Sequence, residues 1–434
     1  MILNLITTLA VAFSTYFSDA TLRLDYIFSG NASTQEISFL EAFRSDVWAG
    51  RRSNLDAALL ESNGMVTVQD AATGTVIYRN GFSTLFQEWQ VTEEAKSVTK
   101  GFECCLQVPW PKKPVDISVT LKDHRNVVRA SLKHRIDPND ILIRPLKPTH
   151  GYRQILGGGN FESRIDVVIV GDGYTREESA KFYSDAARVS GQLMKHEPFA
   201  SNAGRFNFVA LALDSEESGV SEPGRGRWKN TALSSHYDTF YQDRYLTSSN
   251  MRTLYDALAG VPFEHVIILV NTPRYGGGGI YNSLTVAAAD NPTTGVVLVH
   301  EFGHAFAGLA DEYAYDDEQA GTYPGDIEPW EPNITTLTDF GSKWQDMVPE
   351  GVKIPTPVDE MEKRPDIRRI WNTLPAGVQE ELNRKVGVYE GGGYRSKGIY
   401  RPVQECRMRM NECEHFCPVC TRAIQHTIDY YTGN

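Results

Sequence analysis

The segment His300–Glu301–Phe302–Gly303–His304 places two imidazoles and one carboxylate within a stretch of five residues. Imidazole nitrogens are common ligands of zinc, and a carboxylate can serve as a general base. In a helix, residues four apart differ in direction by only about 40°. The rings of His300 and His304 would then project from one face and reach the same ion, each at about 2.0–2.1 Å.

Glu301 would point about 100° away from His300 on the same helix. It is therefore poorly placed to join the two imidazoles as a ligand, but it can reach a water molecule bound to the metal. Zinc lowers the pKa of such a water toward 7 and polarises a substrate carbonyl. We therefore predict that Glu301 accepts the proton of the water and passes it to the leaving amine.

A catalytic zinc site needs at least one further protein ligand and an open position. In a continuous helix, Asp311 would lie about 16 Å from His300 along the axis, too far to share an ion. Gly308 can adopt a positive φ, end the helix and let the chain fold back. The spacing then favours Asp311 as the third ligand, with Glu312 as the alternative. In a purely structural site, four protein ligands would surround the ion and Glu301 would have no role.

The elements that must position these residues follow an alternating pattern of strands and helices. Such alternation predicts an α/β sandwich, and continuous apolar strands are typical of a sheet covered on both faces. We interpret His265, which begins one of the strands, as a core residue. The predicted strands are Ile165–Val170, Phe206–Leu213 and His265–Val270, and the predicted helices are Thr175–Lys195 and Asn250–Ala259.

The glycine run Gly276–Gly279 does not fit a phosphate-binding loop, because no Lys-Ser/Thr pair follows it. We predict instead a turn that leads into an edge strand at Leu284–Ala289. The free edge of such a strand can bind an extended peptide as one more strand.

Short runs of alternating apolar and polar residues extend from about Thr21 to Leu146, with Gly, Asn and Asp between them. This pattern predicts a small antiparallel β-sandwich domain. The segment Arg144–Pro148 is typical of a linker, so the predicted domains are residues 21–148 and 149–434. His124 and His134 are interpreted as ordinary strand or surface residues.

The first twenty residues contain an apolar run, Ile2–Phe13, followed by the small residues Ser18 and Ala20. This pattern predicts a signal peptide over residues 1–20 and a secreted, periplasmic or cell-surface location, with a buried segment as the alternative. No other stretch reaches the length of a membrane span. The net charge of −12 argues against nucleic acid or an anionic membrane as the main partner.

Four of the six cysteines, Cys406, Cys413, Cys417 and Cys420, lie within fifteen residues. They could form a structural four-thiolate zinc site or two local disulfides, and an oxidising compartment favours the disulfides. A thioredoxin-like role is disfavoured, because no βαβ context surrounds Cys417 and Cys420.

The segment His300–Tyr313 resembles the active-site helix of the metzincin clan, HExxHxxGxxH/D, although its Gly and its acid each lie one position later. The string HEFGHxFxGLxDEY is similar to family M64, the IgA-peptidase-like metallopeptidases. The likeness covers nearly the whole chain. Other stretches that resemble exported bacterial members are Gly276–Tyr281, Asp326–Trp330, Cys406–Met408 and Phe416–Cys420.

This resemblance implies a zinc endopeptidase with a metzincin-like α/β/α catalytic sandwich behind an N-terminal β domain. The family pattern assigns Zn²⁺ to His300, His304 and Asp311, and the role of base to Glu301. It implies a methionine in a tight turn beneath the metal, for which Met408 is the best match and Met410 the alternative. The substrate would be a protein or peptide.

Two other classes of function compete with the endopeptidase. One is a catalytically idle zinc fold that binds a host protein or glycan, although a binding protein has no need of Glu301. The other is a different metallohydrolase such as an amidase. As a further donor to the oxyanion, Tyr313, Tyr394 and Tyr400 are equivalent candidates, and the run Gly391–Tyr394 is expected to line the side-chain pocket.

Overall fold

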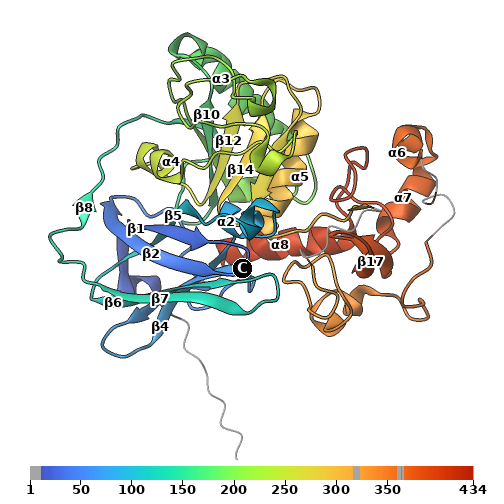
Figure 1. Cartoon of the computed structure of the whole chain (residues 1–434), viewed down its shortest axis with the longest axis horizontal. Coiled ribbons are helices and arrows are strands. Elements are labelled where there is room, and N and C mark those ends of the chain that lie inside the picture. Colours follow the sequence, from blue (N-terminus) through green and yellow to red (C-terminus); the bar gives the residue numbers. More distant parts are fainter. Residues whose placement is uncertain (1–10, 316–322, 359–362, 364–365, 434) are drawn as a thin grey trace, which may run out of the picture.

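The computed structural model describes residues 11–315, 323–358, 363 and 366–433. The N-terminal part of the chain is a β-sandwich. Two four-stranded sheets share one apolar core (Figure 1). All pairings are antiparallel except the short contact between β2 and β8. One sheet has the order β5-β1-β2-β8 (Lys100–Pro111, Phe17–Gly30, Gln35–Ser45, Arg144–Pro145), and the other β4-β3-β6-β7 (Val76–Phe82, Gly64–Asp70, Val115–Lys122, Val128–Ile136).

The alternating sequence of these strands produces the sandwich. In β6, Val115, Ile117, Val119 and Leu121 are buried, while the residues between them are partly exposed. Alternate side chains of a strand point to opposite faces, so one face of this sheet is the core. The predicted antiparallel β domain is confirmed.

The second part contains a six-stranded sheet of order β13-β14-β12-β10-β11-β9. The four inner strands are parallel, and the two outer strands are antiparallel to their neighbours. Every residue of β10 is buried, as predicted for a sheet covered on both faces. In the order of the sheet, from β13 to β9, the six strands span Gly277–Ile280, Leu284–Ala288, His265–Val270, Ile165–Asp172, Phe206–Leu211 and Arg153–Leu156.

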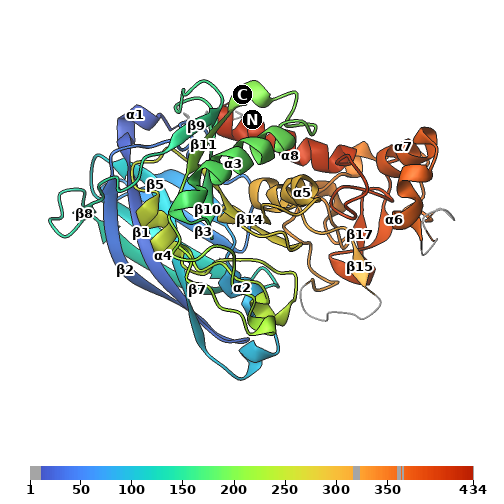
Figure 2. The same ribbon diagram turned by 90° about the horizontal axis from the view of Figure 1, so that it is seen from above.

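Helices cover both faces of this sheet (Figures 1 and 2). On one face, α3 (Ser179–Leu193), α5 (Thr294–Ala307) and α8 (Pro418–Thr432) contribute to a single core. On the other face, α4 (Met251–Ala257) packs against the alternate strand residues. The predicted α/β/α architecture is therefore confirmed.

The prediction that Leu284–Ala289 is an edge strand is wrong. Its residues form β14, inside the sheet, and the edge strand is β13, the glycine run itself. The reason is steric: a Cβ at Gly277 would lie 2.9 Å from Val297 Cγ1, and one at Gly279 would lie 2.1 Å from the Glu301 carbonyl oxygen. Only glycine allows this strand to approach α5 so closely.

A smaller C-terminal region follows α5 and packs beside it (Figure 1). Its three-stranded sheet has the order β15-β17-β16. Its elements are β15 (Ala314–Tyr315), α6 (Ile367–Ile370), α7 (Ala376–Arg384), β16 (Tyr389–Gly392) and β17 (Tyr394–Arg401).

Residues 1–10 of the predicted signal peptide lie outside the described residues. Phe13–Tyr16 form the short helix α1, and β1 begins at Phe17, which is 1% exposed within the sandwich core. An end of the signal peptide after Ala20 would therefore remove part of β1. In the part of the chain that the structure describes, no helix has the length and apolar character needed to cross a membrane.

A buried ion-pair network joins the β-sandwich to the second part. Arg23 binds Asp25 through two hydrogen bonds of 2.7 Å and reaches Asp256 of α4 (Met251–Ala257) at 2.6 Å. Arg252 of α4 bonds to Asp25 at 3.1 Å and also to Glu41. Arg23 and Asp25 are 1% and 0% exposed, so each charge depends on its partners for compensation.

We expect Arg23→Ala to lower the free energy of unfolding by about 3–5 kcal/mol, because it leaves the buried Asp25 carboxylate poorly compensated. The control is Arg135→Ala, whose pair with Asp116 is 2.9 Å long but whose own side chain is 61% exposed, so a loss below about 1 kcal/mol is expected. Denaturant titration measures both. Equal losses in the two variants would contradict the importance of this network.

Candidate metal centre and active site

Helix α5 carries the sequence His300–His304 in its last two turns. Its apolar side chains pack on the sheet, with Leu298, Phe302 and Phe306 at 0% exposure. The helix ends at Gly308, which has φ +61° and donates its N–H to the carbonyl of His304 at 3.0 Å. The predicted helix and its glycine terminus are both present.

The chain folds back after Gly308 and brings Asp311 against the two imidazoles. His300 Nε2 lies 3.0 Å from both Asp311 Oδ1 and His304 Nε2, and His304 Nε2 lies 3.4 Å from Asp311 Oδ1. Two donors that are each about 2.0–2.1 Å from a tetrahedral ion lie about 3.3 Å apart. The spacing and the chemistry of these three donors therefore fit zinc.

Backbone carbonyls orient both imidazoles. His300 Nδ1 bonds to the carbonyl of Arg407 at 3.0 Å, and His304 Nδ1 bonds to the carbonyl of Leu309 at 2.5 Å. A carbonyl oxygen can only accept, so each Nδ1 carries a hydrogen and each Nε2 faces the centre, where the neutral ring can offer a lone pair to a cation.

Of the two candidate third ligands, Glu312 points away from the imidazoles. Its carboxylate accepts a hydrogen bond from Asn333 Nδ2 at 2.9 Å and lies 3.1 Å from Cys420 Sγ. Asp311 Oδ1 instead lies 3.0 Å from His300 Nε2, so of the two neighbouring acids it is Asp311 that faces the histidines.

The charges at the centre depend on one another. Burial alone would lower the pKa of His304, but the Asp311 carboxylate raises it to about 9. Burial would likewise raise the pKa of Asp311, yet His304 and His300 hold it well below its usual range. A metal ion and a proton therefore compete for His304.

Glu301 lies beside β13 on the pocket side of α5. A Cβ at Gly277 would come within 3.0 Å of Glu301 Cγ, so the glycine strand leaves room for this side chain. Burial raises the pKa of Glu301, while His300 and His304 lower it. Its pKa is thus shifted toward neutrality, which suits a group that must take up and release a proton.

Met408 lies beneath the two histidines. It is fully buried, and its Sδ would be 3.1 Å from a Cβ placed at Gly303, between His300 and His304. Its carbonyl accepts the N–H of Glu312 at 2.8 Å. Met410 instead belongs to a separate cluster with α6 and α7. The structure therefore places Met408 where the resemblance expected a packing methionine.

Of the three candidate tyrosines, Tyr394 is in direct contact with the centre. Its hydroxyl donates a hydrogen bond to Asp311 Oδ2. Tyr313 also lines the pocket, whereas Tyr400 does not. Within the run Gly391–Tyr394, only Tyr394 lines the pocket; Gly393 instead holds the backbone of Asp311, with its N–H 2.8 Å from the carbonyl.

We expect Tyr394→Phe to weaken metal binding or kcat/KM by about 10–100-fold, because the second oxygen of Asp311 loses its hydrogen-bond donor. Tyr400→Phe is the control and is expected to change little. Metal titration and steady-state kinetics measure the effect. A Tyr394→Phe variant indistinguishable from Tyr400→Phe would refute this role.

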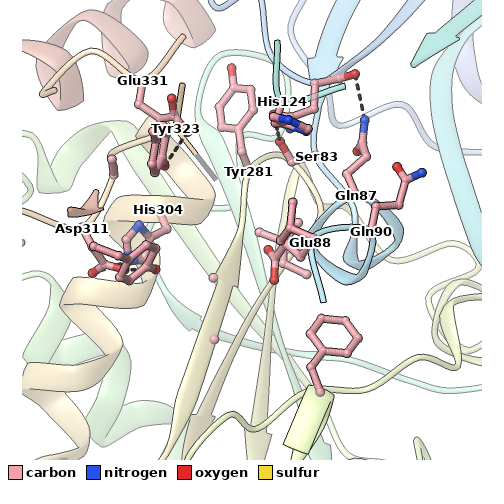
Figure 3. Close-up of a pocket in the computed structure, with 18 of the residues that line it drawn as sticks. Ser83, Gln87, Glu88, Gln90, His124, Tyr281, His304, Asp311, Tyr323 and Glu331 are labelled. Atoms are coloured by element: carbon pink, nitrogen blue, oxygen red, sulfur yellow. Dashed lines mark hydrogen bonds and ion pairs between the residues drawn. The ribbon is translucent and has the colours of Figure 1, made fainter. Parts of the chain in front are cut away.

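The metal centre opens into a pocket of about 1610 Å³ that both domains line (Figure 3). His304 and Asp311 lie on one side, and residues of the β-sandwich lie on the other. These residues include Glu88 on α2 (Leu85–Trp89) and also His124. From the sequence we interpreted His124 as an ordinary strand or surface residue.

The position of Glu88 follows from the helix that carries it. Leu85, Phe86 and Trp89 of α2 are buried in the sandwich, so Glu88 projects toward the pocket. There it accepts a hydrogen bond from the hydroxyl of Tyr245. Burial raises the pKa of Glu88 to about 7, although Tyr245 and His304 lower it. Nothing in the local sequence distinguishes this residue from a surface glutamate.

A pKa raised above the usual 4.5 means that the folded chain holds the Glu88 proton more tightly than the unfolded chain does. This contribution to stability is complete below about pH 4.5 and is lost as the pH rises through about 7. We therefore expect Glu88→Gln to be more stable than wild type at pH 8, by about 1–3 kcal/mol, and equal to it at pH 4.5. Thermal unfolding with a chelator present measures this, and Glu93→Gln, at an exposed carboxylate that pairs with Lys96, is the matched control.

The six cysteines are all free. Cys406, Cys417 and Cys420 lie together, but Cys413 is elsewhere and accepts a hydrogen bond from Asn383 Nδ2 at 3.4 Å. The predicted four-thiolate site and the two predicted local disulfides are therefore both absent. The turn after Cys406 carries Cys413 to the α6–α7 cluster instead.

Comparisons with known proteins identify relatives of both parts. The family model described as IgA Peptidase M64 matches residues 154–373 and 376–428, and the model described as Peptidase M64 N-terminus matches residues 12–133. Among solved structures, metalloproteinase-II from Bacteroides fragilis matches at 13% identity and a TM-score of 0.21, over 52% of this chain and 74% of that one. A likeness this weak does not define a shared fold. No curated protein matched the chain.

Proposed function

The chain belongs to the M64 family of peptidases, and from this premise we propose that it is a zinc-dependent endopeptidase whose catalytic base is Glu301. The observation that carries the proposal is the set of three donors, His300, His304 and Asp311, beside Glu301 at the edge of a large pocket. Three protein ligands with an open position are typical of catalytic zinc, whereas structural zinc is enclosed by four.

A zinc ion held by these donors would supply Lewis acidity and lower the pKa of a water molecule. The protein must then move the proton. Glu301 accepts it from the attacking water and donates it to the nitrogen of the leaving amine, so that the carboxylate is regenerated. Tyr394 holds Asp311 in place, and Tyr313 lies in the pocket, where its hydroxyl can stabilise the oxyanion.

The edge strand β13 supports an extended polypeptide as substrate. Its partner strand in the sheet is β14, its outer edge is bridged by Tyr245 at Gly277, and it runs alongside Glu301 and His304. A peptide that hydrogen-bonds to a strand edge is held in extended form, with its scissile bond over the centre. Because Gly277–Gly279 have no side chains, this side of the pocket leaves room for a substrate. Helix α2 of the β-sandwich forms the opposite wall.

We further propose that the chain acts outside the cytoplasm, based on the apolar run Ile2–Phe13. Cleavage before Phe17 would preserve all of β1, unlike cleavage after Ala20. Intact mass measurement of the chain recovered from an exporting cell tests this. Recovery of the full chain from the cytoplasm alone would contradict export.

Digestion of casein and of an unbiased peptide library tests the peptidase. We expect internal cleavage that a zinc chelator abolishes and that added Zn²⁺ restores. If no peptide is cut under any metal condition although the protein binds one equivalent of zinc at His300, His304 and Asp311, the fold serves for binding alone.

A further inference from the structure

A second group of metal-ligating side chains lies behind the active site. Glu312, Cys406, Cys417 and Cys420 present four ligand atoms that all lie within 4.8 Å of one another. Each residue is at most 1% exposed, so the group is closed to solvent. None of the four lines the substrate pocket.

We propose that these four side chains bind a second metal ion, Zn²⁺ by their chemistry, in a closed structural site. Three sulfurs and one carboxylate oxygen form a complete tetrahedral set for zinc. Two sulfurs that are each about 2.3 Å from such an ion lie about 3.8 Å apart. The observed separation of Cys406 Sγ and Cys420 Sγ is 3.9 Å.

The carboxylate of Glu312 provides an independent reason for a cation. Its Oε1 contacts Asn333 and Cys420, whereas its Oε2 is buried without a hydrogen-bond partner. A buried carboxylate oxygen without a partner is costly, and in folded proteins such groups are paired or bind metals. A cation between Glu312 and the three sulfurs supplies the missing interaction.

The backbone is arranged to support negatively charged sulfurs. The N–H groups of Met408 and Cys417 point to Cys406 Sγ at 3.5 and 3.3 Å, and the N–H of Cys420 points to Cys417 Sγ at 3.4 Å. Amide hydrogen bonds to thiolates are characteristic of sulfur ligands in metal sites.

A disulfide explains the group less well. One disulfide among Cys406, Cys417 and Cys420 would leave the third thiol and Glu312 buried without compensation. Metal binding involves all four side chains and needs no oxidant, since the three thiols and the carboxyl group lose only their bound protons to the solvent.

The site connects the two loops that build the active centre. Glu312 directly follows the ligand Asp311, and Cys406 is two residues before Met408, beneath the histidines. Arg407, between them, accepts the hydrogen bond from His300 Nδ1 on its carbonyl. A metal ion here would fix both loops to the start of α8 through Cys417 and Cys420.

Metal counting on the full chain tests this proposal separately from the peptidase. We expect two zinc ions per wild-type chain and one per His304→Ala chain, because that variant loses only the catalytic site. Cobalt substitution of His304→Ala should give the thiolate-to-cobalt charge-transfer band in the near ultraviolet. A His304→Ala protein without metal, or with cobalt but without that band, would overturn the second site.

Cysteine variants assign the ligands. Cys420→Ser should lower the metal content by one ion per chain, whereas Cys413→Ser, at a buried cysteine outside the group, should retain both ions. If Cys420→Ser does not fold, thiol alkylation of native wild type decides. Protection of Cys406, Cys417 and Cys420 until a chelator is added supports the site, and recovery of any two of them as a disulfide refutes it.

Discussion

Glu301→Gln is expected to lower kcat by about 10²–10⁴-fold while the protein keeps its full metal content, because the amide cannot accept the proton of the attacking water. The change preserves the shape of a side chain that lies against the glycines of β13. The ligands His300, His304 and Asp311 are untouched. The effect should therefore appear in kcat, with KM little changed.

Glu88→Gln is the matched control for this variant. It makes the same chemical change on the opposite wall of the pocket, and we expect kcat to fall by less than about tenfold, since Glu88 lies outside the proposed proton path. Metal analysis must accompany the kinetics of both. If Glu301→Gln retained wild-type kcat with its metal bound, Glu301 would not be the base.

Asp311→Ala should abolish measurable peptidase activity at ordinary zinc concentrations by removing one of three ligands. Zinc binding in zinc-finger peptides, which supply four ligands, amounts to about 10–16 kcal/mol, so one ligand accounts for about 2.5–4 kcal/mol, or about two to three orders of magnitude in affinity. The loss should be greater than for Tyr394→Phe, which removes only a hydrogen bond to Asp311.

Zinc titration in a competing chelator measures the affinity of Asp311→Ala, and saturating zinc should partly recover the rate. Asp346→Ala is the control, because that carboxylate is 70% exposed and pairs with Arg422 at the surface. A variant of Asp311 that bound zinc as tightly as Asp346→Ala would mean that another group is the third ligand.

The proposed metal ligands could be predicted because their geometry is local. The four-residue spacing of His300 and His304 fixes their relative direction in any helix, and Gly308 supplies the turn that brings Asp311 back. The alternation of apolar and polar residues likewise predicted the β-sandwich, since it has the period of a strand.

The rest of the site depends on contacts between distant parts of the chain. Glu88 and Tyr245 are 157 residues apart, and no periodicity relates them. The assignment of the edge strand failed for a similar reason. The glycine run was interpreted as a turn because its close approach to α5 is a tertiary contact that local sequence does not express.

The cysteines show how spacing can mislead. Four cysteines within fifteen residues suggested one group. In the structure, however, the turn after Cys406 places Cys413 outside that group. The fourth member is instead Glu312, which is 94 positions before Cys406 in the sequence. Only the folded chain shows that the neighbouring acids Asp311 and Glu312 serve different groups.

Two folding units line the pocket, so the groups proposed for catalysis and the groups placed to select a substrate lie in different units. The groups proposed to break the bond all belong to α5 and the loops beneath it, whereas α2 and His124, across from them, belong to a sandwich with its own core. Loops of that sandwich can change in length and charge without disturbing the metal ligands. Remodelling the sandwich half is therefore expected to change the preferred substrate while the proposed metal ligands stay in place.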